Sequence, residues 1–243
     1  MTELATIIVL AWPDTMVIQE GKWYDEPMRW VGALKNGYYK AGHAAFLLIN
    51  NTSGVVQYFD FGRYHTPIKY GRVRSKLTDP DIAIKHKAQI TDGVIINLEE
   101  ILLERYNNEA CHGNGRMTAS IVKNIDYEKA LYRVLKMQAR EAVYYGPFEF
   151  RGTTCSRLVA KVVLFSTKDW LTKLMIMLPY TISATPRSNN KVLNDCCHYY
   201  EINKGLVKMK KSKFFRFKKF FRTFYSRSET IKVPVSNLTV EFI

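Results

Sequence analysis

Apolar residues along the chain occur in short blocks that are separated by turn-forming residues. Residues 5–11 are apolar except for Thr6 and end at the Trp-Pro-Asp sequence of residues 12–14, which predicts a buried strand. Two further blocks, 39–49 and 55–61, are rich in aliphatic and aromatic residues, and the turn sequence NNTSG at 50–54 separates them. We therefore expect these two blocks to form a β-hairpin.

Helical periodicity marks three later segments. Residues 97–108 and 126–142 place apolar residues at helical spacing, with Asn97 and Asp126 as the expected N-caps. A third helix is expected to begin at residues 153–155, where either of two threonines supplies the cap for a helix that starts with cysteine. Because hairpins and helices cluster in separate parts of the chain, the pattern predicts the α+β class.

The composition is typical of a folded protein with one large domain. Apolar residues make up 47% of the 243 residues, which is enough to build a core. No stretch reaches the roughly 18 apolar residues that a membrane-spanning helix needs, and the first residues lack the basic start of a signal peptide. We therefore expect a cytoplasmic protein, with one main domain at 1–205 and a C-terminal segment at 206–243 packed on the same domain.

One of the four cysteines has a position that favours reactivity. Cys155 stands at the start of its predicted helix, where the positive end of the helix dipole and free backbone N–H groups favour the thiolate. The same N–H groups are suited to hold a developing oxyanion. The alternative interpretation is that Cys155 is a small buried apolar residue, as free cysteines often are.

The remaining cysteines do not predict a metal site. Cys196, Cys197 and His198 are consecutive, whereas tetrahedral zinc sites use ligands spaced as in C-x-x-C. Cys111 lies next to His112, and the GNGR sequence that follows lacks the full pattern of a phosphate-binding loop. The sequence therefore predicts neither a metal nor a cofactor.

The sequences GHAAFLLIN at 42–50 and GTTCSRLV at 152–159 resemble the circularly permuted branch of the NlpC-type papain-like superfamily, which includes YiiX-like and lecithin:retinol acyltransferase-like proteins. In that branch the histidine comes first, on a strand, and the cysteine much later, at a helix start; here His43 precedes Cys155 by 112 residues. The resemblance covers about residues 38–170. It implies a papain-like fold with an antiparallel sheet packed against helices.

The same resemblance implies a chemistry. Cys155 would be the nucleophile and His43 the base of a cysteine peptidase-like or amidase-like hydrolase, or of an acyltransferase, acting on an amide, ester or thioester. Peptide-like cell-wall fragments, other isopeptides and lipid acyl groups are the substrate classes that it implies. In the family, a third polar residue on the neighbouring strand orients the histidine.

The hairpin limits the choice of that third residue. A four-residue turn after Ile49 would place His43 opposite Asp60, whose carboxylate would fix the tautomer of the imidazole. A slip of one residue would place Phe61 there instead. Asp60 is the assigned residue, although it is also interpretable as a turn or cap residue. The alternatives for the orienting role are Gln57 and Tyr58.

Charged residues follow the hairpin closely. His65 is interpreted as a structural or exposed residue, with a rim position near substrate as the alternative. Arg63, Arg72 and Arg74 are interpreted as part of a solvated face, with contact to an anionic group of a substrate as the alternative.

Much of the net charge of +14 lies in one segment near the C-terminus. Residues 208–227 contain nine lysines and arginines and no acidic residue. As a helix over 213–225, this segment would show an aromatic arc and a basic arc, suited to packing on the core, to an anionic membrane surface, or to nucleic acid as the weaker alternative. It motivates a second hypothesis, a non-catalytic module of the same fold that binds a membrane or polyanion, which would make the protein peripheral at the membrane.

Overall fold

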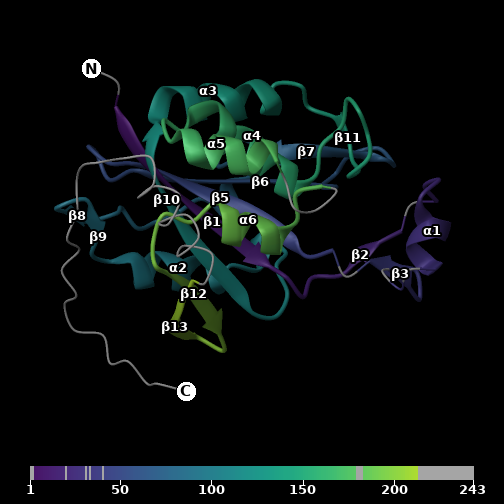
Figure 1. The fold of residues 1–243 in the computed structure, drawn as a ribbon, viewed down its shortest axis with the longest axis horizontal. Coiled ribbons are helices and arrows are strands. Elements are labelled where there is room, and N and C mark those ends of the chain that lie inside the picture. Colours follow the sequence, from purple (N-terminus) through teal and green to yellow (C-terminus); the bar gives the residue numbers. More distant parts are fainter. Residues whose placement is uncertain are drawn as a thin grey trace.

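The computed structural model describes residues 3–19, 21–30, 32, 34–39, 41–178 and 183–212 of the chain. Its centre is an eight-stranded antiparallel sheet with the strand order β11-β7-β6-β5-β1-β10-β12-β13 (Figure 1). Its strands are β1 (Leu4–Trp12), β5 (His43–Asn50), β6 (Val56–Gly62), β7 (Tyr70–Arg74), β10 (Met117–Asp126), β11 (Val143–Tyr144), β12 (His198–Asn203) and β13 (Leu206–Lys211). Two small sheets comprise β2 (Val17–Ile18), β3 (Leu34–Lys35) and β4 (Tyr38–Tyr39), and β8 (Ile90–Thr91) and β9 (Val94–Ile95). The predicted α+β class is confirmed.

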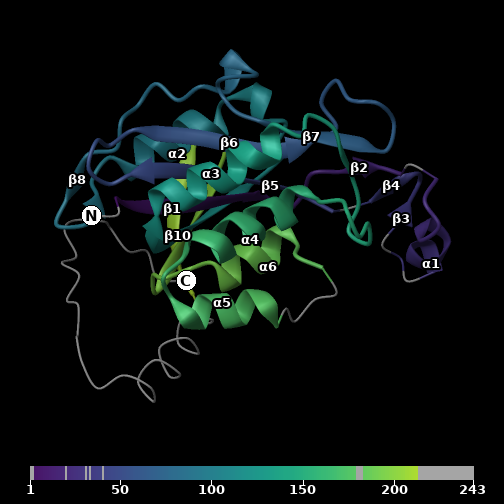
Figure 2. The same cartoon turned by 90° about the horizontal axis from the view of Figure 1, so that it is seen from above.

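Helices cover both faces of this sheet, as Figures 1 and 2 show. The helices are α1 (Asp25–Trp30), α2 (Leu98–Tyr106), α3 (Tyr127–Gln138), α4 (Cys155–Ser166), α5 (Trp170–Met177) and α6 (Pro186–Val192), with short 3-10 turns η1 (Pro80–Ile82) and η2 (Glu109–Cys111). Helices α3 and α4 pack on one face and α2 on the other. The segment with β2, α1, β3 and β4 projects from one end of the sheet in both views.

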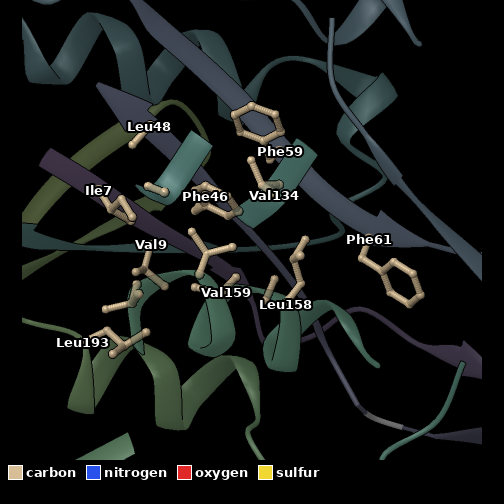
Figure 3. Close-up of a cluster of buried hydrophobic side chains, with 14 of the residues drawn as sticks. Ile7, Val9, Phe46, Leu48, Phe59, Phe61, Val134, Leu158, Val159 and Leu193 are labelled. Atoms are coloured by element: carbon tan, nitrogen blue, oxygen red, sulfur yellow. The ribbon is translucent and has the colours of Figure 1, made fainter. Parts of the chain in front are cut away.

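Two buried clusters lie on the two faces of the sheet, because side chains alternate along each strand. In β5, Phe46 belongs to the cluster under α3 and α4, whereas Leu47 belongs to the cluster under α2. Both residues are 0% exposed, and all of β5 is buried. Burial on both faces explains why residues 44–49 form a continuous apolar run in the sequence. Figure 3 shows part of the first cluster; the labelled residues are Ile7, Val9, Phe46, Leu48, Phe59, Phe61, Val134, Leu158, Val159 and Leu193.

The predicted hairpin is confirmed as β5 and β6, but its predicted register is wrong by two residues. Asp60 pairs with Ala45, not with His43, and Ile49 pairs with Val56. The turn is longer than four residues because the Asn50 side chain accepts hydrogen bonds from two backbone N–H groups inside it and Gly54 closes it at φ 69°. A shift of two residues preserves the face on which each side chain lies, since the side-chain period of a strand is two.

Local capping signals fix where α3 and α4 begin. The Asp126 side chain accepts a hydrogen bond from Lys129 N at 3.1 Å, and the Thr154 side chain accepts one from Arg157 N at 3.2 Å. Both caps are as predicted. Asn97 also precedes its helix, α2, but its side chain bonds the backbone of residues 87 and 89 instead of capping the helix.

The described C-terminal part is a hairpin of β12 and β13 on the edge of the sheet, which spans residue 206, the expected start of the C-terminal segment. The basic aromatic residues from 213 onward lie outside the described residues, so the expectations for that segment stay predictions. Among the described helices, none has the length and apolar character to span a membrane.

Candidate active site

Cys155 is the first residue of α4, and the chain before it is held firmly. Thr153 donates its backbone N–H to Tyr144 O at 2.9 Å, and Gly146 N donates to Thr153 O at 3.1 Å. This short parallel pairing fixes the approach to the helix, and the cap by Thr154 fixes its first turn. Cys155 is 4% exposed, and the helix behind it buries its apolar side in the core.

His43 is the first residue of β5, at the same end of the sheet. It pairs with Trp12 of β1, and the indole and imidazole centroids are 5.7 Å apart. Gly42 precedes it at φ 72°, and a Cβ atom there would stand 2.9 Å from Trp12 O and 3.1 Å from Pro186 Cγ. Only glycine fits at this position without strain. Trp12 reaches the site through the pairing of β1 with β5, which no local sequence signal predicts.

The structure brings His43 and Cys155 together. The two side chains lie near enough that each changes the pKa of the other through a hydrogen-bond interaction and through charge. Burial alone would raise the pKa of the thiol, but His43, the backbone N–H of Ala44 and the Ser156 hydroxyl outweigh burial, so the pKa of Cys155 is lowered. Burial alone would lower the pKa of His43, yet Asp60 and Cys155 raise it to about 9. Both shifts favour a thiolate–imidazolium pair.

Asp60 is fully buried and lies on the His43 side of the sheet. Its Oδ2 atom is 3.4 Å from His43 Nε2. That distance is long for a hydrogen bond, and Nε2 makes no hydrogen bond of good geometry. The carboxylate still raises the pKa of His43, through its side-chain contact with the imidazole and through its charge.

A buried guanidinium holds Asp60 from the other side. Arg74 Nε donates to Asp60 Oδ1 at 2.9 Å and Arg74 Nη2 donates to Oδ2 at 2.6 Å. Arg74 is 2% exposed, and its guanidinium also stacks 3.5 Å from the Tyr64 ring centroid and donates to Ala110 O. The expectation that Arg74 is solvated was wrong, because β7 places it directly opposite Asp60 inside the molecule. Burial would raise the pKa of Asp60, but His43 and Arg74 lower it to about 2.

The two alternatives for the orienting residue have other partners. Gln57 lies opposite Leu48, which faces the α3 and α4 side, and its Nε2 donates to Tyr127 Oη at 2.7 Å. Tyr58 shares the face of Asp60, but its hydroxyl donates to Asp60 Oδ2 at 3.0 Å. Tyr58 thus supports the carboxylate and does not contact the imidazole.

Other candidate residues are arranged differently. Arg72 forms a two-point ion pair with Asp79, at 2.6 and 2.7 Å, and Arg63 donates to Ile18 O at 3.0 Å. His65 is exposed, in the left-handed region at φ 49°. The Cys197 thiol lies 3.5 Å from its neighbour His198. Within the described ranges, no group of three or more His, Cys, Asp or Glu side chains is placed to hold a metal ion.

Comparisons with known proteins point to one family. The family described as type VI secretion system effector TseH-like matches residues 7–171, a span that contains His43, Asp60 and Cys155. The crystal structure of the type VI secretion system effector TseH is similar at a TM-score of 0.54 and 16% identity, covering 86% of this chain and 99% of that chain. No curated protein matches the chain. At this identity the structural likeness shows the fold, which is the predicted papain-like one. The chain belongs to the TseH-like family of type VI secretion system effectors.

Proposed function

We propose that this protein is a cysteine hydrolase in which Cys155 attacks a carbonyl carbon, His43 transfers protons and Asp60 orients and stabilises the imidazolium. The observation that carries the proposal is the thiol at the start of α4 beside a histidine whose pKa is raised to about 9. Free histidine has a pKa near 6.5. A neutral thiol and neutral imidazole are therefore disfavoured at neutral pH, and the reactive ion pair is favoured.

The proposed reaction uses these groups in order. The Cys155 thiolate forms a bond to the carbonyl carbon, and the electron pair of the C=O bond moves to the oxygen. The backbone N–H of Cys155 is one of the unpaired donors of the first helical turn and is suited to stabilise that oxyanion. When the tetrahedral intermediate collapses, the His43 imidazolium donates its proton to the leaving amine or alcohol, and an acyl thioester on Cys155 remains.

Water then releases the acyl group. Neutral His43 takes a proton from the water, the resulting hydroxide attacks the thioester carbonyl, and the thiolate leaves with its electron pair. A second acceptor in place of water would make the protein an acyltransferase. Both residues are buried, with Cys155 4% and His43 8% exposed, which limits the bulk water at the site. Burial by itself opposes the two charged forms, and the attraction between the two groups together with the Asp60 carboxylate outweighs it.

The substrate belongs to the proposal as well. Amide bonds in peptide-like material are the class that best fits a papain-like cysteine site in a secretion effector family. The order of the two residues, histidine on β5 before cysteine on α4, supports the circularly permuted branch of the NlpC-type papain-like superfamily.

A thiol-directed probe tests the proposal without a known substrate. Wild-type protein treated with an iodoacetamide probe at pH 6 should be labelled mainly at Cys155, and Cys155→Ala should lose that label. Cys197→Ala is the matched control, because Cys197 is exposed and lies outside the site. His43→Gln should slow the labelling of Cys155 by about tenfold or more, since the thiol then loses its cationic partner.

Turnover is measured separately by mass spectrometry on a panel of peptide-like amides, cell-wall fragments and acyl esters. A Cys155 acyl adduct, with product release that Cys155→Ala abolishes, is the expected result. Labelling of Cys155 at the same rate in the wild type and in His43→Gln over pH 5 to 8 would contradict the proposed pair.

A further inference from the structure

Four basic side chains on and next to α3 and α4 lie close enough for three of them to act on the fourth through their charge. Arg133 lies on α3, Arg140 follows that helix, and Arg157 and Lys161 lie one turn apart on α4. The two helices pack together, and the Arg133 guanidinium lies 5.6 Å from the ring centroid of Phe165, one turn beyond Lys161. We call these four residues the α3/α4 basic cluster.

No acidic side chain balances this cluster within the described part of the chain. The charged groups that act on the Lys161 ammonium are Arg157, Arg133 and Arg140, and all of them are cations. Burial first, and these three charges after it, lower the pKa of Lys161 to about 8. Two other arginines of the described structure do form ion pairs with carboxylates, Arg74 with Asp60 and Arg72 with Asp79.

Some N–H donors of the cluster make no hydrogen bond in the described structure. Arg133 Nε is buried and has no hydrogen-bond partner in the described structure, and a buried donor without a partner is costly. Arg157 uses one nitrogen, Nη1, for the carbonyls of Gly146, Pro147 and Glu149, and Lys161 donates to Gly152 O at 3.3 Å. These carbonyls hold the two α4 side chains in place, but they carry no negative charge that would offset the two positive charges. The result is a group of cations, two of which are held by backbone carbonyls, with unused N–H groups.

We propose that the α3/α4 basic cluster binds a phosphate-bearing anion. Like charges at close range are destabilising, so a protein that keeps four of them together gains most when an anion with more than one negative charge lies between them. Guanidinium forks match the oxygens of phosphate in a two-point geometry, and three of the four cations are arginines. Soluble phosphates and the headgroups of anionic lipids share this chemistry. The inference concerns a second site and does not depend on the proposed hydrolase function.

The test uses the full-length protein with inorganic pyrophosphate in one arm and vesicles in the other. Calorimetry measures pyrophosphate binding, and sedimentation measures binding to phosphatidylglycerol-containing and to pure phosphatidylcholine vesicles. The cluster variant is Arg133→Gln with Arg140→Gln, because neither side chain holds the loop before Cys155. The control variant, Lys35→Gln with Lys87→Gln, removes the same charge from exposed positions outside α3, α4 and the basic segment 208–227.

Saturable pyrophosphate binding that weakens by about tenfold or more in the cluster variant, and little in the control, would support a soluble phosphate as ligand. Binding only to phosphatidylglycerol vesicles, with the same dependence on the cluster variant, would support a lipid headgroup. Equal weakening in both variants, or no saturable binding in either arm, would overturn the proposal. Without anion, the cluster variant should be at least as stable as the wild type in thermal unfolding, because repulsion is relieved; this confirms that any loss of binding is not a loss of folding.

Discussion

Arg74 and Asp60 lie directly opposite each other on β7 and β6 and form a two-point ion pair inside the molecule, at 2.6 and 2.9 Å. His43 approaches the same carboxylate from the other side, at 3.4 Å. Asp60 therefore divides its charge between a permanent cation and a histidine that changes its protonation during the proposed reaction. Arg74 keeps the carboxylate ionised and in place, and it also limits how strongly the carboxylate attracts the imidazolium.

Replacing Arg74 should show how much its ion pair with Asp60 stabilises the fold. Arg74→Met leaves a buried carboxylate without its main partner, so we expect a loss of about 3–5 kcal/mol in the free energy of unfolding. The double variant Arg74→Met with Asp60→Leu leaves no unpaired charge and should recover part of that loss. Urea denaturation of the two single variants and the double variant gives the coupling energy. Strictly additive losses would mean that the pair does not stabilise the fold as a unit.

Reactivity and turnover should depend differently on pH. Because the pKa of Cys155 is lowered, its alkylation by iodoacetamide should remain fast below the pH at which an ordinary thiol ionises. Turnover needs protonated His43 and should decline as pH rises through about 9, whereas alkylation should not decline there. If the alkylation rate and the turnover rate changed with pH in the same way, that result would contradict proton donation by the His43 imidazolium.

Asp60→Asn should shift the alkaline limit of turnover to lower pH. Without the carboxylate charge the pKa of His43 falls toward its ordinary value, and the turnover rate should drop by roughly 10²-fold or more. Gln57→Leu is the matched control from the same strand, since Gln57 faces the opposite side and bonds Tyr127. If both variants had the same pH profile as the wild type, Asp60 would have no role in setting the protonation of His43.

The same shifts set the pH range in which these residues stabilise the fold. The pKa of His43 is raised in the folded state, so its contribution is complete below its ordinary pKa of 6.5 and is lost as pH rises through about 9. The pKa of Asp60 is depressed, so its contribution is present above its ordinary value of 3.8 and is lost as pH falls through about 2. The difference in unfolding free energy between wild type and His43→Gln should therefore be larger at pH 6 than at pH 10. A difference that grows with pH would contradict the raised pKa of His43.

Local signals in the sequence were sufficient for the parts of the site that depend on neighbouring residues. The cap by Thr154 and the apolar side of α4 identify Cys155 as the first residue of a helix, and both are confirmed. The turn cluster after Asn50 identifies the hairpin. The register failed because the turn length depends on how the Asn50 side chain bonds the turn and on the φ 69° conformation of Gly54.

Parts of the site that depend on distant pairing were not predictable in this way. Arg74 follows Asp60 by a long loop, and only the register of β6 with β7 brings the two side chains together. Tyr64 and Trp12 likewise meet the site through tertiary packing, at the Arg74 guanidinium and at the His43 ring. A single sequence contains no periodicity or motif that reports such contacts. In the fold, β10 was missed for the same reason, since its partner β1 is far away in the chain.

Gly42→Ala should disturb the site without removing a functional group. The new methyl group would stand 2.9 Å from Trp12 O and 3.1 Å from Pro186 Cγ, and the φ of 72° is itself unfavourable for alanine. Relief requires the chain to move at the residue that precedes His43, which would separate the imidazole from both Asp60 and Cys155. We expect a destabilisation of roughly 1–3 kcal/mol together with slower alkylation of Cys155 at pH 6. Gly93→Ala serves as the control, since Gly93 has nearly the same φ, 71°, but open space around its Cβ position. It shares the backbone strain and lacks the clash, so it should lower stability without changing the reactivity of Cys155; if Gly42→Ala also left that reactivity unchanged, the position of His43 would not depend on the close packing at Gly42.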